Sequence, residues 1–149
     1  MTNVPLDDSP DIVGYESVLQ KDVLQFLERM KRTWGQIEFY RMNNLPVPVK
    51  DAQGNTVAYR PFSKYSPKGL ADIMILFRIR HTTECVPIFL EIKRPGVKIQ
   101  LRPSQSAFRT QVMDVNAVYL AVNDVNEVEK LFWHYYYMNI PDKDVDKPS

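Results

Sequence analysis

The stretch from residue 70 to residue 93 reads LADIMILFRIRHTTECVPIFLEIK, and it decides the fold. Residues 70–80 and 86–93 are apolar runs of strand length, each with apolar residues on both faces over part of its length. Such runs are typical of strands in the middle of a sheet that is covered on both sides. Residues 81–85 are short enough to join the two runs as a hairpin. We therefore predict two central antiparallel strands.

Further elements are predicted on both sides of this hairpin. Three helices are predicted. Helical spacing of apolar residues indicates one at residues 15–32, and a proline in the first turn indicates one at 103–114. A capping-box spacing indicates a third, from residue 124 into the aromatic stretch 132–137. Apolar runs predict two more strands, at 37–42 and 117–122. A turn signal at 51–55 predicts a short hairpin that joins 47–49 to 57–59. The order α-β-(hairpin)-β-β-α-β-α predicts an α/β fold with one mixed sheet flanked by helices.

Length and composition fit one folded domain. The 149 residues are 44% hydrophobic and 25% charged, as in an ordinary globular protein. We assign residues 15–138 to the domain, with 44–68 as an inserted loop and hairpin, and residues 1–14 and 139–149 to flexible ends. The single cysteine, Cys85, excludes a disulfide framework within the chain and a cysteine-based zinc cluster.

The sequence shows neither a membrane-spanning run nor a secretory signal. Its longest apolar runs, such as residues 117–122, are far shorter than the roughly 20 residues that cross a bilayer. The N-terminus has no basic start followed by an apolar stretch. We therefore expect a cytosolic protein with no membrane partner.

The small net charge of +1 hides an uneven distribution. Residues 1–13 carry three acids and no base, and residues 141–149 carry three acids and two bases, so residues 14–140 carry about +5. The bases in this body form clusters that include Lys64, Lys68, Arg94, Lys98, Arg102 and Arg109. Such clusters suit a polyanionic partner. On charge alone, an ordinary solvated surface explains them better.

Three ionisable residues stand where packing does not explain them. Glu91 and Lys93 end the second central strand, and alternation places both on one face while Ile92 faces the core. Asp72 stands among apolar residues near the start of the first strand, where a carboxylate needs a reason. Hairpin pairing places that start opposite the end of the second strand, so Asp72 falls beside Glu91 and Lys93. Two converging carboxylates repel each other, and a bound Mg²⁺ or Mn²⁺ is the usual remedy.

Five short motifs occur in the order of a known family. They are Glu16-Ser-Val-Leu-Gln20, Arg41-Met-Asn43, Gly69-Leu-Ala-Asp72, Glu91-Ile-Lys93-Arg-Pro and Leu101-Arg-Pro-Ser-Gln105. Over residues 15–131 the chain thus resembles the VRR-NUC (virus-type replication-repair nuclease) domain of the PD-(D/E)XK nuclease superfamily. The resemblance implies a restriction-endonuclease-like αβββαβ core that hydrolyses phosphodiester bonds in DNA with Mg²⁺ or Mn²⁺.

The same resemblance implies a role for each matching residue. The metal ligands would be Asp72, Glu91, the Ile92 carbonyl and Glu16, the last directly, through water or to a second ion. Lys93 would orient or deprotonate the attacking water and offset charge in the transition state. Gln105 would lie at the edge of the site, where it touches water or the surroundings of Lys93.

Several of these residues have a plainer explanation. Glu16 and Gln20 also suit the solvated face of a helix, and Gln105 also suits capping of its own helix backbone. Arg102 departs from the family, which commonly has serine there. An arginine cannot accept the N-cap hydrogen bond, so we expect a weaker helix start, although this side chain can meet a phosphate.

Stand-alone members of the family resemble junction resolvases, which are two-fold dimers. We therefore expect a homodimeric, structure-selective endonuclease for branched DNA such as four-way junctions, with a role in DNA repair and a bacterial or phage origin. A chain this small leaves no room for a separate recognition domain, so selectivity would come from shape and backbone contacts. Two alternatives stay open. One is a sequence-specific restriction-type endonuclease whose loop at 43–68 reads bases, and the other is a catalytically idle DNA-binding module.

Overall fold

The two central strands form as predicted and organise the main sheet. The computed structural model describes residues 14–42, 47–60 and 68–138. Within these ranges, β4 (Ile73–Arg78) pairs antiparallel with β5 (Cys85–Ile92). The turn between them is closed by a backbone hydrogen bond of 3.0 Å from Ile79 N–H to the Glu84 carbonyl. The predicted hairpin is therefore confirmed.

The first central strand begins later than the sequence predicted, at Ile73 instead of residue 70. Asp72 stands immediately before it, and Oδ2 of this side chain accepts the backbone N–H of Ile92 at 2.7 Å. A carboxylate thus takes the hydrogen bond that a strand carbonyl would otherwise accept from β5. The regular ladder stops at this point because a side chain has replaced the backbone as the partner.

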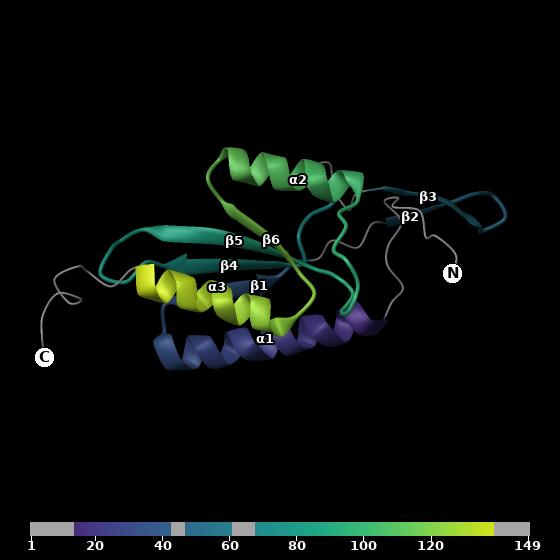
Figure 1. The fold of residues 1–149 in the computed structure, drawn as a ribbon. Coiled ribbons are helices and arrows are strands. Elements are labelled where there is room, and N and C mark those ends of the chain that lie inside the picture. The colour runs from purple at the N-terminus through teal and green to yellow at the C-terminus, as the bar shows by residue number, and fades with distance from the viewer. Residues whose placement is uncertain (1–13, 43–46, 61–67, 139–149) are drawn as a thin grey trace, which may run out of the picture.

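Four strands make the main sheet, in the order β1-β4-β5-β6 (Figure 1). β1 (Ile37–Arg41) is antiparallel to β4, and β6 (Val118–Val122) is parallel to β5. Parallel neighbours need a crossover connection, and α2 (Pro103–Asp114) supplies it. The sheet is therefore mixed, with β4 and β5 in the middle as predicted.

Helices cover both faces of this sheet (Figure 1). α1 (Gly14–Trp34) and α3 (Val125–Met138) lie on one face, and α2 lies on the other. The larger core, on the α1 and α3 face, contains Ile88, Leu90 and Ile92, each at most 2% exposed. On the α2 face, Phe89 packs edge-on against Phe108 with ring centroids 5.3 Å apart. Side-chain alternation along β5 therefore builds two cores from one strand, in a mixed α/β fold.

The helices begin and end close to the predicted residues. The first helix stops at Trp34, where Gly35 adopts a positive φ of 66° and donates its N–H to the Lys31 carbonyl at 2.9 Å. The bounds of α2 are those predicted, residues 103–114. At the start of α3, Oδ1 of Asp124 accepts the N–H of Asn126 at 2.9 Å and so caps the first turn.

Two aromatic residues of α3, Phe132 and Tyr135, pack inward. Phe132 is 2% exposed and meets Phe77 edge-on with ring centroids 5.8 Å apart. Tyr135 is half-buried and lies 5.7 Å from Phe77 by the same measure. These contacts fix α3 against the sheet and contribute to the main core.

The insertion folds into the predicted hairpin, which forms a separate two-stranded sheet. Its strands are β2 (Val47–Lys50) and β3 (Thr56–Arg60), and it projects from the main body (Figure 1). Oδ1 of Asp51 accepts the backbone N–H groups of Gln53 and Asn55 and closes the turn. Neither strand contacts another helix or strand of the described chain, and every residue of β3 is exposed.

Parts of the expected organisation fall outside the described residues. The flexible ends assigned to 1–14 and 139–149, apart from Gly14, and the flanks of the insertion at 43–46 and 61–67 are among them. Across 14–42, 47–60 and 68–138, no helix combines the length and apolar character needed to cross a membrane.

Candidate active site

The predicted site residues meet at the end of the sheet where β5 stops and α2 begins. Asp72 is fixed there by its hydrogen bond of 2.7 Å from the Ile92 N–H, which places its carboxylate beside the last residues of β5. Glu91 and Lys93 share the α2 face of that strand, while Ile92 is buried in the opposite core. The arrangement that hairpin pairing predicted is the one observed.

Two charged side chains of this group are buried. Glu91 is 3% exposed and Lys93 is 8% exposed, and Gln105 beside them is 5% exposed. Among the residues with described side chains, these three are the buried polar or charged ones. Burial of charge is costly unless the charged groups are paired or hydrogen-bonded, so the hydrogen bonds among these side chains decide whether they can stay charged.

Gln105 connects the two buried charges. Its Oε1 accepts from the Lys93 ammonium at 2.6 Å, and its Nε2 donates to Oε1 of Glu91 at 2.7 Å. The amide can have only this orientation, because the Lys93 ammonium and the Arg102 backbone N–H are both donors and need the amide oxygen. Asp72, Glu91, Lys93 and Gln105 are called the site network below.

The same glutamine also caps its helix. Oε1 of Gln105 accepts the backbone N–H of Arg102 at 2.9 Å, three residues earlier. The Arg102 side chain makes no capping hydrogen bond, as the departure from the family pattern predicted, and Pro103 occupies the first turn. The capping interpretation of Gln105 is therefore correct, and the same side chain also contacts Lys93, as the resemblance implied.

A glycine lets the start of α2 approach the Asp72 segment. Gly69 has a positive φ of 76°, and a Cβ built there would overlap the backbone of Ser104. Any other residue would push the first turn of α2 away from residues 69–72. The distance between Gln105 and the carboxylates therefore depends on a side chain being absent at position 69.

Glu16 reaches the network from the first turn of α1. It is half-buried, and its carboxylate accepts a hydrogen bond from the backbone N–H of Arg94. Burial raises the pKa of Glu16, the positive charge of Lys93 lowers it, and the negative charge of Asp72 raises it again. Gln20 follows one turn later and is half-buried. The structure thus brings Glu16 to the predicted group.

Glu91 has a strongly perturbed carboxyl group. Burial, the negative charges of Asp72 and Glu16 and a side-chain hydrogen bond with Asp72 raise its pKa to about 9, although Lys93 acts in the opposite direction. Its Oε1 is held by Gln105, whereas Oε2 is buried with no hydrogen-bond partner. A carboxylate oxygen in this position needs a proton or a cation beside it.

The carboxylate oxygens of this site suit a divalent cation such as Mg²⁺, which binds few protein groups and keeps several waters. Among the described residues, no group of three or more His, Cys, Asp or Glu side chains is arranged so that it could hold a metal ion. Mg²⁺ needs no such cluster, because it keeps several waters and commonly takes one or two carboxylates. Asp72 and Glu91 supply two, and the unpartnered Oε2 of Glu91 is an open ligand position. These residues therefore fit Mg²⁺ or Mn²⁺.

Sequence reasoning missed Tyr119. Its strand reads as fully apolar, yet the tyrosine hydroxyl is buried without a hydrogen-bond partner. Burial raises its pKa, and the charges of Glu91 and Asp72 raise it further, so the hydroxyl lies in the electric field of the site. The signal in the sequence was one polar atom in an otherwise apolar strand.

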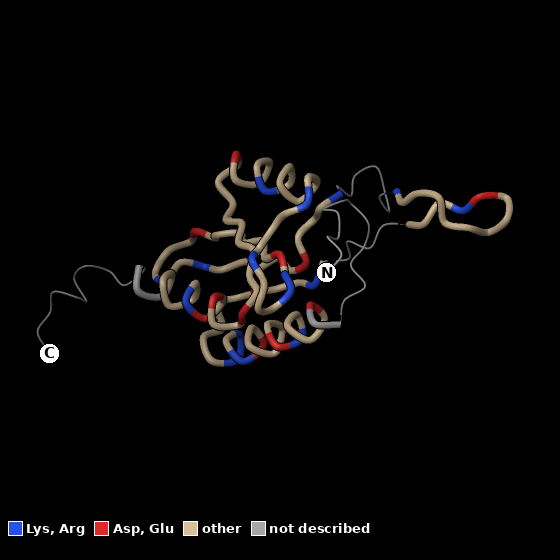
Figure 2. The backbone as a smooth tube through the Cα atoms, turned by 45° about the vertical axis from the view of Figure 1, so that its right-hand side comes forward, with Lys and Arg blue, Asp and Glu red and all other residues tan. Residues whose placement is uncertain are grey.

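The predicted DNA-binding bases with described structure lie before β4, on the loop from β5 to α2, and in α2. Lys68, Arg94, Lys98 and Arg109 are exposed and Arg102 is half-buried, while Lys64 lies outside the described residues. Figure 2 shows blue segments on both helical layers as well as on the loop after β5. The bases closest in sequence to the site network are Arg94, Lys98 and Arg102, on the loop from β5 to α2.

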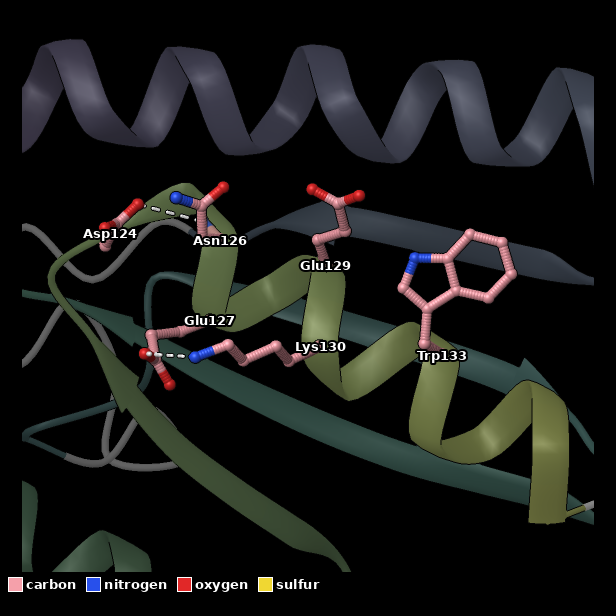
Figure 3. Close-up of a pocket in the computed structure, with 6 residues that line it drawn as sticks. All are labelled: Asp124, Asn126, Glu127, Glu129, Lys130 and Trp133. Carbon is pink, nitrogen blue, oxygen red and sulfur yellow. Dashed lines mark hydrogen bonds and ion pairs between the residues drawn. The ribbon is translucent and has the colours of Figure 1, made fainter.

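A separate hollow lies on the surface of α3 (Figure 3). It measures about 370 Å³ and is lined by Asp124, Asn126, Glu127, Glu129, Lys130 and Trp133. Lys130 and Glu127, one turn apart on α3, form an exposed ion pair of 3.7 Å beside it. None of the lining residues belongs to the site network, so the hollow is not part of the candidate active site.

Comparison with models of protein families, with curated proteins and with solved structures finds no match to this chain. Functional inference therefore depends on the site network and its surroundings.

Proposed function

We propose that this protein is a metal-dependent DNA nuclease of the PD-(D/E)XK type. The observation that carries the proposal is the buried network in which Gln105 holds Glu91 and Lys93 beside Asp72. Without its hairpin and last helix, the order α1-β1-β4-β5-α2-β6 reads αβββαβ, which agrees with a restriction-endonuclease-like core. A buried carboxyl group and a buried ammonium beside a half-buried carboxylate have no evident structural purpose at a strand end.

Each residue of the network has a defined task in this proposal. Asp72, Glu91 and the Ile92 carbonyl would hold Mg²⁺ or Mn²⁺, with Glu16 reaching it directly or through water. When bound, the cation polarises the scissile phosphate and favours a hydroxide-like water. Lys93 would orient that water and offset the negative charge that develops on the phosphate oxygens. Gln105 keeps the Lys93 ammonium in place.

The hydrolysis itself needs few groups. The oxygen of a water molecule forms a bond to phosphorus and loses a proton to solvent, while the bond from phosphorus to the leaving sugar oxygen breaks and that oxygen takes a proton from solvent. Arg94 and Lys98 lie on the exposed loop that follows Lys93, where they can meet phosphates next to the scissile one. These backbone contacts suit recognition of DNA shape, so we propose a structure-selective endonuclease of the junction-resolvase type.

The test is a cleavage assay on plasmid, linear duplex, flap and four-way junction DNA. Cleavage should appear with Mg²⁺ or Mn²⁺, and Ca²⁺ should support binding without efficient cutting. Asp72→Asn is the matched control, because asparagine keeps an acceptor for the Ile92 N–H and removes the charge. Undiminished cleavage in excess EDTA, or by the Asp72→Asn protein, would exclude this mechanism. Metal-dependent DNA binding without cleavage of any substrate would favour an idle DNA-binding module.

We also propose a homodimer, since paired incisions in a junction need two sites facing opposite ways. Light scattering at micromolar concentration, with and without a junction in Ca²⁺, should give the mass of two chains. A monomer under both conditions would instead favour a nicking or flap-cutting enzyme.

One observation supports a second candidate, a sequence-specific endonuclease. The hairpin of β2 and β3 is a two-stranded ribbon that projects from the body, and the major groove of DNA admits a ribbon of that kind. Digestion of a long linear DNA separates the two candidates. Discrete fragments of reproducible length would support sequence specificity, whereas cutting only at branched structures would support the junction-type enzyme.

A further inference from the structure

We infer that Tyr119 is a positioning residue for Glu91, to which its hydroxyl is joined by one buried water molecule. The inference rests on the proposed function, because it names the residue that orients a ligand of the proposed metal. It concerns a side chain that no motif of the sequence includes.

The sheet places Tyr119 on the correct face and at a suitable distance. In the parallel pairing of β5 and β6, Tyr119 lies opposite Phe89, and Glu91 is two residues further along β5. Paired residues and those two positions away share a face, so Tyr119 and Glu91 both face α2. One strand spacing and two residue rises separate their Cα atoms by roughly 8 Å, a gap that a tyrosine and a glutamate side chain can span with one water.

Packing explains the ring of Tyr119 and leaves its hydroxyl unexplained. The residue is 9% exposed, and its ring meets Phe108 of α2 with centroids 6.2 Å apart, in a cluster with Ala71. A phenylalanine would make the same contacts. The hydroxyl is buried without a partner, and a buried polar atom of this kind is unfavourable unless something satisfies it.

The second unsatisfied oxygen lies in the same region. Glu91 Oε2 is also buried without a partner, and the Glu91 charge acts directly on the pKa of Tyr119. A neutral phenol donates and a carboxylate accepts, so the two atoms are chemically complementary. A water with two such partners has what an ordered buried water needs.

The bridge would fix the orientation of the Glu91 carboxylate. Gln105 holds Oε1 from the α2 side, and the water would hold Oε2 from the β6 side. A carboxylate that is restrained at both oxygens keeps its lone pairs directed at the ion, and loss of such a supporting contact typically weakens metal affinity about tenfold or more.

The test uses Tyr119→Phe in the full chain, with Tyr135→Phe as the matched control. Tyr135 is also a partly buried tyrosine, but it packs on Phe77 in the other core. We expect calorimetric Mn²⁺ affinity to fall about tenfold in the Tyr119→Phe protein and to stay unchanged in the control. The melting temperature without metal should change little for Tyr119→Phe, because the ring contact with Phe108 remains.

The outcomes separate this inference from the proposed function. Unchanged Mn²⁺ affinity of Tyr119→Phe, with the parent binding Mn²⁺, would overturn the role of Tyr119 and leave the proposed metal site standing. A parent that binds no Mn²⁺ would overturn the proposed function and this inference together. A crystal structure with electron density for one water between the hydroxyl and Glu91 Oε2 would support the bridge, and empty space there would refute it.

Discussion

The Lys93 ammonium donates to Oε1 of Gln105 at 2.6 Å, and both side chains are buried. Lys93 ends the central strand region, whereas Gln105 belongs to the first turn of α2. The contact therefore fixes a charged group relative to two elements at once. If the proposed function is correct, a lysine restrained in this way is oriented before the substrate arrives.

Lys93→Ala should separate chemistry from binding. In the proposed mechanism the variant loses the ammonium that would assist the attacking water, whereas Asp72 and Glu91 would remain to hold the ion. Loss of one such group typically lowers turnover by a factor of about 10² to 10³. DNA affinity should change much less. Cleavage and DNA binding are measured with Mg²⁺ present, with Lys130→Ala on α3 as the control, and cleavage within threefold of the parent would remove Lys93 from the site.

The stability of the metal-free protein should depend on pH through Glu91. Its pKa rises from 4.5 to about 9 on folding, so the folded protein holds this proton more tightly than the unfolded chain does. The contribution of Glu91 to the free energy of unfolding is therefore fully present below pH 4.5 and is lost as the pH rises from there through 9. We expect a loss on the order of a few kcal/mol between pH 5 and 9. Urea unfolding at several pH values measures it. Glu91→Gln should flatten the profile in that window, and parallel profiles for the two proteins would contradict the prediction.

Gly69→Ala should destabilise the protein and disturb the site. The new Cβ would meet the backbone of Ser104 at a positive φ of 76°, so α2 must shift or the chain must strain. We expect a loss of at least about 2 kcal/mol in the free energy of unfolding. Gly54→Ala is the matched control, since its φ is 83° but nothing lies within 4 Å of its Cβ. That variant should lose only about 1 kcal/mol, and equal losses would show that crowding at α2 is unimportant.

Lys98→Ala should weaken DNA binding through a phosphate contact. Lys98 is exposed on the loop that follows the site network, so its substitution should leave the metal affinity unchanged. The slope of log affinity against log salt should become shallower by about one. Lys130→Ala is again the control, because Lys130 lies on α3 with its side chain 76% exposed. An unchanged slope for Lys98→Ala would identify this base as ordinary solvated surface.

Replacement of residues 47–60 by a short glycine–serine linker tests the projecting hairpin. The strands of this hairpin contact no other helix or strand of the described chain, so thermal unfolding of the main body should be unchanged. Cleavage of a four-way junction should persist if the enzyme recognises shape through its body. Loss of a discrete fragment pattern on linear DNA, with junction cleavage retained, would assign base reading to the hairpin. A large drop in melting temperature would show that the hairpin supports the fold.

The parts of the fold and of the candidate site that the sequence predicted follow from rules about neighbouring positions in a strand or a hairpin. Alternation placed Glu91 and Lys93 on one face, and hairpin pairing placed Asp72 beside them, because both rules depend only on neighbouring positions. The late start of β4 was not predictable, since it depends on Asp72 taking the Ile92 N–H with its side chain. Tyr119 was missed for a related reason. Its hydroxyl becomes significant only when β6 lies next to β5, and this pairing joins segments about thirty residues apart.

The double role of Gln105 has a consequence for how the protein loses activity when it begins to unfold. One side chain both caps the start of α2 and holds the two buried charges, so the helix start and the site form a single cooperative unit. Any opening that frees the first turn of α2 also releases Lys93. Loss of activity in mild denaturant should then coincide with faster hydrogen exchange at the Arg102 amide, before the central strands open.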